Sequence, residues 1–188
     1  MSPEPPRRVA RVDSEEVPSG YALTLATIKS MRRFARDAYK DERISQLARV
    51  VTQGVAPRDR RGEAAAILAW MQETFRYTAL PWHPKGLARV ADAAWTLLDA
   101  PSKTGECASL TVAFAALAMS LGMPARFRVV GKDENQPYDF GHALAVVDVG
   151  SANAPDWVAA DPSYQHPLGW PFRPGDVSPA RVFQDFDP

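Results

Sequence analysis

Three residues in the second half of the chain have side chains that together can carry out nucleophilic catalysis. Cys107 is the only cysteine among the 188 residues, and His142 and Asp161 follow it. A thiolate attacks carbonyl carbons, a histidine takes and returns the proton, and a carboxylate holds the imidazole in its useful tautomer. The residue types therefore predict a thioester reaction with Cys107 as nucleophile, His142 as base and Asp161 as orienting group.

The segment around the cysteine predicts where the thiol lies. Residues 106–121 are apolar on nearly every face, which indicates a buried helix, and Gly122 with Pro124 ends it. Cys107 then falls in the first turn. There the helix dipole favours a thiolate, and unpaired backbone N–H groups are available to an oxyanion. The adjacent Glu106 opposes the thiolate through its own charge but favours the helix start.

His142 and Asp161 each lie at the end of a predicted strand. His142 opens the strand over residues 142–150, and Asp161 closes the next strand, over 157–161. Antiparallel pairing of these strands would return Asp161 to the neighbourhood of His142. Asp148 is unsuitable as the partner because it lies about 20 Å along the same strand as His142.

The remaining pattern predicts an α+β fold in which N-terminal helices and a buried central helix pack on a small antiparallel sheet. We expect a flexible arm over residues 1–18, a domain over 19–165 whose first part (19–62) is helical, and a proline-rich tail over 166–188. Residues 132–141 are predicted to be a polar loop. We expect helices over 19–39, 41–53, 64–75, 87–98 and 106–121, and strands over 125–131, 142–150 and 157–161.

Several short motifs resemble the transglutaminase-like superfamily of bacterial or phage type. They are G-x-C-x-S at the start of a helix, LGMPAR after that helix, H-A at the start of a strand, W-V-x-x-D-P, and the upstream AWMQETFRY. The resemblance covers residues 67–163 and implies a papain-like core with Cys, His and Asp in that order. It therefore implies the same three residues, Cys107, His142 and Asp161.

The chain also departs from its expected relatives. Many bacterial and phage members have an acidic pair after the cysteine, where this chain has Ala108 and Ser109. Papain-like proteases have a glutamine about six residues before the cysteine, where this chain has Pro101. The second oxyanion donor is therefore unassigned, and Trp95 is a candidate by analogy with transglutaminases.

The resemblance implies attack on a peptide bond or on a glutamine side-chain amide. Hydrolysis is favoured over cross-linking for a small chain without a calcium-loop motif, and no metal or organic cofactor is expected. The alternative function is a non-catalytic binding or assembly module, for example in a phage, that retains the fold. Structural alternatives also stand: Cys107 as an inert buried thiol, His142 as a structural histidine, and Asp161 as a cap of the turn before Pro162.

The net charge of zero is unevenly distributed. Residues 1–61 contain 13 Lys/Arg against 8 Asp/Glu. Lys29, Arg32, Arg33 and Arg36 have the spacing of one helix face, which is either a solvated surface or a docking site for an acidic partner. Because positive and negative side chains are equal in number over the whole chain, the charge argues against nucleic acid as a partner.

No segment of the sequence predicts a membrane span, since the longest apolar stretch, 112–119, is too short to cross a bilayer. The first 20 residues also lack the apolar core of a signal peptide. We therefore expect a cytoplasmic or phage virion-associated protein whose substrate is a peptide or protein.

Overall fold

The structure is a computed structural model, and it describes residues 12–16, 21–78, 87–133, 136–170 and 183–187. The elements follow in the order β1 (Val12–Glu16), α1 (Tyr21–Ala38), α2 (Glu42–Val51), α3 (Arg60–Thr74), β2 (Arg76–Tyr77), β3 (Leu87–Ala91), η1 (Trp95–Asp99), β4 (Thr104–Gly105), α4 (Cys107–Ser120), β5 (Ala125–Asp133), β6 (Gln136–Asp148), β7 (Trp157–Ala160) and β8 (Phe183–Phe186). The predicted α+β class is confirmed.

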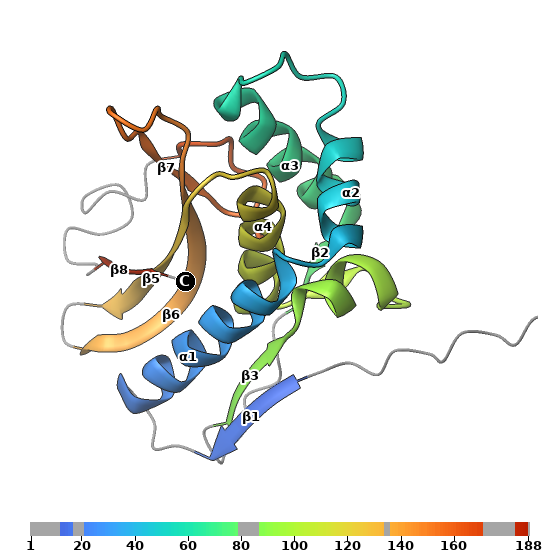
Figure 1. Cartoon of the computed structure of the whole chain (residues 1–188). Helices are drawn as coiled ribbons and strands as arrows, with labels where there is room; N and C mark the ends of the chain where they lie inside the picture. The colour runs from blue at the N-terminus through green and yellow to red at the C-terminus, as the bar shows by residue number, and fades with distance from the viewer. Residues whose placement is uncertain (1–11, 17–20, 79–86, 134–135, 171–182, 188) are drawn as a thin grey trace, which may run out of the picture.

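Helix α4 lies at the centre of the fold, between the sheet that contains β5 and β6 and the helices α1, α2 and α3 (Figure 1). All eleven residues from Ala108 to Ala118 are buried, as the apolar pattern predicted. Many of them are alanines, which let neighbouring elements approach closely. The helix ends at Ser120, and Gly122 just beyond it has a φ of +80°, which suits glycine, while the Met123 N–H donates to the Ala118 carbonyl.

The main sheet has the strand order β7-β6-β5-β8, and every neighbouring pair is antiparallel. The three predicted strands are present, with Ala125 opposite Val147 and Ala145 opposite Ala160. The prediction of a polar loop over 132–141 is wrong, because β5 and β6 continue into this region as a hairpin. Backbone hydrogen bonding sustains the pairing there despite the polar side chains, and register shifts beyond Val130 absorb the irregularity.

Two predictions near the N-terminal half are also wrong. Residues 12–16, assigned to the flexible arm, form β1 by pairing antiparallel with β3. Residues 87–98, predicted as one helix, divide into β3 and the π-helix η1. The break falls at Asp92, whose side chain accepts from the Trp95 N–H and whose carbonyl accepts from Thr96. Long-range pairing therefore overrode the local helical pattern.

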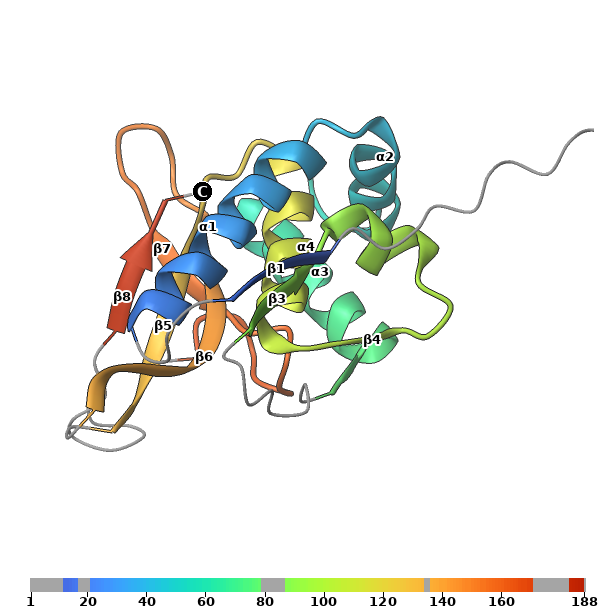
Figure 2. The same ribbon diagram turned by 90° about the horizontal axis from the view of Figure 1, so that it is seen from below.

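The N-terminal helices α1, α2 and α3 match their predicted positions to within a few residues at most ends. The side chain of Asp41 caps α2, and the side chain of Asp59 caps α3. Figure 2 shows α1 between the main sheet and the β1–β3 pair, so α1 separates the two sheets.

Part of the segment predicted to be a proline-rich tail, residues 166–188, belongs to the folded domain. Residues 183–186 form β8 on β5, with Phe186 opposite Phe127, and the turn over 166–170 packs near β7. Residues 171–182 lie outside the described part. The C-terminal segment thus contributes an edge strand to the sheet.

Within the described residues, no helix combines the length and the apolar character that crossing a bilayer would need.

Candidate active site

Cys107 is the first residue of α4, and its side chain is half-buried. The preceding strand β4 pairs in parallel with β2, so Gly105 lies opposite Tyr77. A Cβ atom on Gly105 would lie 2.9 Å from the side chain of Leu110, which is fully buried. Glycine at position 105 therefore allows the close packing that seats the first turn of the helix.

Glu106 is the N-cap of α4. Its carboxylate accepts from the N–H groups of Ala108 at 2.7 Å and Ser109 at 2.6 Å, and also from the Ser109 hydroxyl. Burial raises the pKa of Glu106, and the hydrogen bonds from Ser109, Ala108 and Cys107 oppose that rise. Glu106 is therefore a structural cap as well as a charge beside the thiol.

This capping decides which helix-terminal donor remains for an oxyanion. The Leu110 N–H bonds to the Glu106 carbonyl, and Glu106 also holds the N–H groups of Ala108 and Ser109. Among the four N–H groups that open α4, the described contacts leave the Cys107 N–H for a substrate. The Trp95 backbone N–H donates to Asp92 Oδ1 and is therefore not the second oxyanion donor, which stays unassigned.

His142 and Asp161 come together as their strand positions predicted. The pairing of β6 with β7 runs from Asp148 opposite Trp157 to Ala145 opposite Ala160, so Asp161 emerges on the His142 side. His142 Nε2 lies 2.7 Å from Asp161 Oδ2, and the Asp161 side chain is only 1% exposed. The other Asp161 oxygen accepts from the Ser163 N–H.

The charges around His142 favour its protonated form. Burial lowers the pKa of His142, but hydrogen bonds with Asp161 and Cys107 outweigh it and raise the pKa from 6.5 to about 9. The Cys107 thiol therefore lies near the imidazole, whose Nε2 faces Asp161 and whose Nδ1 remains for the sulfur. A thiol, an imidazole and a carboxylate are the groups that nucleophilic cysteine catalysis requires.

Asp148 and the two remaining histidines, His166 and His83, are not part of this arrangement. Asp148, rejected from its spacing, accepts from the N–H groups of Gly150 and Asp156 and stabilises a turn. His166 stacks on Trp170. His83 lies outside the described residues.

Helix α3 anchors the turn that follows Asp161, a role that no sequence pattern predicted. Gln72 Nε2 lies 3.1, 2.6 and 2.9 Å from the carbonyl oxygens of Asp161, Tyr164 and His166, so these three acceptors share its two N–H groups. The Gln165 side chain donates in return to the Gln72 carbonyl. In sequence Gln72 is only a polar residue on an amphipathic helix, so its contacts depend on the tertiary fold.

Helix α4 is also tied to the strand that carries His142. The Thr111 hydroxyl, one turn after Cys107, donates to the carbonyl of Ala143 at 3.1 Å. This bond connects the turn below the thiol to the residue next to the imidazole, so the two groups are fixed relative to each other.

Residues 45–162 match the family model of the transglutaminase-like superfamily. The chain belongs to the transglutaminase-like superfamily. The superfamily segment begins in α2 and ends just after Asp161, so it contains all three candidate catalytic residues.

A solved structure shares the fold of this superfamily member, and a second one matches it less closely. A proposed protease from Parabacteroides distasonis superposes with a TM-score of 0.59 at 11% identity, over 90% of this chain and 30% of the other. A proposed cysteine protease from Cytophaga hutchinsonii has a TM-score of 0.48 at 17% identity, over 80% of this chain and 48% of the other. The chain therefore spans less than half the length of either structure. None of the curated proteins matches the chain.

Replacing Asp161 by Asn should lower the pKa of His142, because the Asp161 hydrogen bond is the largest contribution that raises it. Because His142 binds its proton more tightly in the folded state, the protonated imidazole stabilises the fold. This contribution is fully present below about pH 6.5 and is lost as the pH rises to about 9. Between these pH values the free energy of unfolding should fall by roughly 3 kcal/mol in the native protein and by much less in Asp161→Asn. Imidazole NMR titration and unfolding at several pH values measure both effects.

The matched control is Asp156→Asn, which removes an exposed carboxylate paired with Arg61. It should leave the His142 titration unchanged. A His142 pKa that is the same in Asp161→Asn and in the native protein would contradict the electrostatic role of Asp161.

Replacing Gln72 by Ala should lower the free energy of unfolding by about 1–3 kcal/mol, because three carbonyls lose their donor. It should also lower the pKa of His142 through a less firmly held Asp161. Thermal unfolding and the same NMR titration are the readouts. Gln46→Ala, which removes an exposed side-chain hydrogen bond to Glu42, is the control and should change neither. An unchanged His142 pKa in Gln72→Ala would limit Gln72 to a purely structural role.

Proposed function

We propose that this protein is a cysteine hydrolase that cleaves amide bonds in peptides or proteins through a thioester intermediate. The supporting observation is the setting of His142, whose Nε2 lies 2.7 Å from Asp161 Oδ2 and whose pKa the Cys107 thiol helps to raise. Membership of the transglutaminase-like superfamily supports the same class of chemistry.

In the proposed reaction Cys107 Sγ, as the thiolate, attacks the amide carbonyl carbon. A C–S bond forms, and the carbonyl π electrons move to the oxygen, which accepts from the Cys107 N–H. When the C–N bond breaks, the imidazolium of His142 gives its proton to the departing amine. The acyl group remains on sulfur as a thioester.

Water completes the cycle. Neutral His142 takes a proton from water as the water oxygen attacks the thioester carbon, and the C–S bond then breaks. The products are a carboxylic acid and the regenerated thiolate–imidazolium pair. Asp161 stabilises the imidazolium and fixes the ring orientation throughout. A reaction that depends on a free thiol suits a reducing compartment, so we place it in the cytoplasm.

A direct assay can separate hydrolysis from amine transfer. The protein is incubated with a reduced, alkylated protein substrate and a fluorescent primary amine, and mass spectrometry detects new termini and amine adducts. We expect new termini to dominate. Cys107→Ala should reduce the rate by about 10³-fold or more and Cys107→Ser should also be inactive, while Ser120→Ala, which loses only a hydroxyl bond at the far end of α4, retains activity. Amine adducts without new termini would assign transfer instead, and no thiol-dependent product would reject the enzyme hypothesis.

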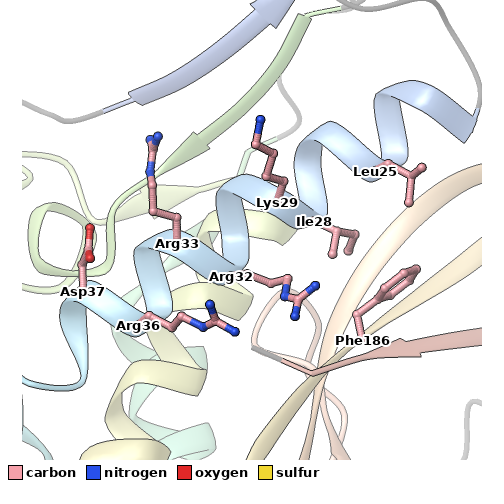
Figure 3. A pocket seen from close by; sticks show the side chains of 8 residues that line it. All are labelled: Leu25, Ile28, Lys29, Arg32, Arg33, Arg36, Asp37 and Phe186. Atoms are coloured by element: carbon pink, nitrogen blue, oxygen red, sulfur yellow. The ribbon is translucent and has the colours of Figure 1, made fainter.

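We propose a second function, docking of an acidic partner, on the basic face of α1. A groove of about 550 Å³ lies between α1 and β8, and its apolar part is formed by Leu25, Ile28 and Phe186. In Figure 3, Arg32 and Arg36 extend from α1 on the side of Phe186, whereas Lys29 and Arg33 extend from the other side. All four cations of the predicted basic face line the groove together with Asp37, so its rim carries an excess of positive charge.

This groove suits a segment with carboxylates and an apolar side chain, because both the charge and the surface are complementary. A fluorescent Glu- and Phe-containing peptide should bind and should lose about tenfold or more in affinity between 50 and 500 mM salt. Arg32→Glu should abolish binding, whereas Arg49→Glu, on α2, should not. Binding that is insensitive to salt, or equal binding of duplex DNA, would contradict an acidic protein partner.

A further inference from the structure

A row of aromatic rings leads away from His142 along the candidate site. The ring of Tyr164 lies 5.2 Å from His142 and 5.7 Å from Tyr77, measured between centroids. His166 continues the row 6.0 Å beyond Tyr164, and Trp170 stacks on His166 at 4.7 Å with an interplanar angle of 7°. We call Tyr77, Tyr164, His166 and Trp170 the aromatic ledge.

The ledge is unusually exposed for its composition. Tyr77, Tyr164 and Trp170 are 40%, 46% and 43% exposed. Only two further large hydrophobic residues in the described part, Leu25 and Val50, are as exposed. Contiguous exposed apolar surface beside a reactive group indicates a binding surface, because a fold without that need would bury it.

The ledge is also held rigidly. Gln72 bonds the carbonyls of Tyr164 and His166, and the Trp170 and Gly169 N–H groups donate to Pro167 and Ala159. On the other side, the β2–β4 pairing places Tyr77 opposite Gly105, two residues before the thiol. Aromatic surface that is ordered in advance binds a ligand at a lower entropic cost.

The chemistry of the ledge selects its ligand. Residues 164–170, YQHPLGW, contain no Asp, Glu, Lys or Arg, so aromatic and apolar groups make up most of the surface that they offer. Exposed ring faces bind flat or apolar groups through dispersion and ring–ring contacts. Because an extended peptide rises about 3.3 Å per residue, the 5.2 Å step from His142 to Tyr164 corresponds to about two residues.

We propose that the aromatic ledge is a substrate subsite that accepts an aromatic or large aliphatic side chain within about two residues of the cleaved amide. This inference rests on the proposed hydrolase function, and it adds the substrate class: peptides with a bulky, uncharged side chain next to the scissile bond. The ledge sets specificity and takes no part in bond making or breaking.

Two measurements test the subsite. The first compares kcat/KM for a peptide series with Phe, Leu, Ala or Glu at each of the two positions on either side of the scissile bond. At one position Phe and Leu should exceed Ala and Glu by about tenfold or more. Trp170→Ala and Tyr164→Ala should reduce that ratio several-fold, whereas Val50→Ala, an exposed apolar residue on α2, should preserve it.

The second measurement needs no turnover. The Cys107→Ala protein is titrated with N-acetyl-phenylalanine amide and N-acetyl-alanine amide, and amide NMR shifts are recorded. The phenylalanine compound should perturb residues 164–170 at concentrations where the alanine compound does not, and Trp170→Ala should weaken this effect.

The outcomes separate the two proposals. Absence of thiol-dependent hydrolysis together with selective binding of the phenylalanine compound rejects the hydrolase and leaves the ledge as a binding surface for bulky uncharged groups. Hydrolysis without preference among Phe, Leu, Ala and Glu, or a preference that Trp170→Ala and Tyr164→Ala leave intact, overturns the subsite and keeps the hydrolase. Failure of the phenylalanine compound to shift residues 164–170 also overturns it.

Discussion

The complete burial of α4 is the constraint on which the rest of the structure depends. A helix that is apolar on every face has to be covered by the sheet, by α1 to α3 and by β3, so its position fixes theirs. Only its ends reach polar surroundings, and its N-terminus is where backbone N–H groups need partners. The Glu106 carboxylate supplies two of these partners and thereby seats Cys107 at the edge of the core. The Cys107 thiol is thus attached to the end of the buried central helix.

The candidate site balances charge around a single imidazole. Glu106 directly precedes Cys107, and Asp161 bonds His142, so two carboxylates border the site. His142 lies between Cys107 and Asp161, and its pKa of about 9 makes it the cation that offsets them at neutral pH. The Asp161 carboxylate is almost fully buried, so its interaction with the imidazole is only weakly screened by solvent. The surrounding turn, held by Gln72, keeps this pair aligned and also presents the aromatic ledge.

Much of this arrangement followed from patterns that are local in the sequence. The apolar run of α4 predicted its burial and its ends to within one residue, and the alternating apolar strands predicted that Asp161 would return to His142. The wrong secondary-structure predictions share one cause. Residues 12–16 and 183–186 become strands only because partners distant in sequence offer free edges, and the hairpin of β5 and β6 extends through polar residues. Local propensity carries no information about such partners.

The sequence by itself determined which residues could react: one cysteine at a helix start, one histidine and one aspartate at strand ends, in the order of the transglutaminase-like superfamily. Only the tertiary structure decided what surrounds them. Glu106 became a cap, Gln72 an anchor for the turn, and Tyr164 the first ring of an exposed ledge, through contacts that span up to 94 residues. The physical reason is that reactivity depends on side-chain chemistry, which the sequence states directly. Positioning depends on packing between elements, which exists only once the chain has folded.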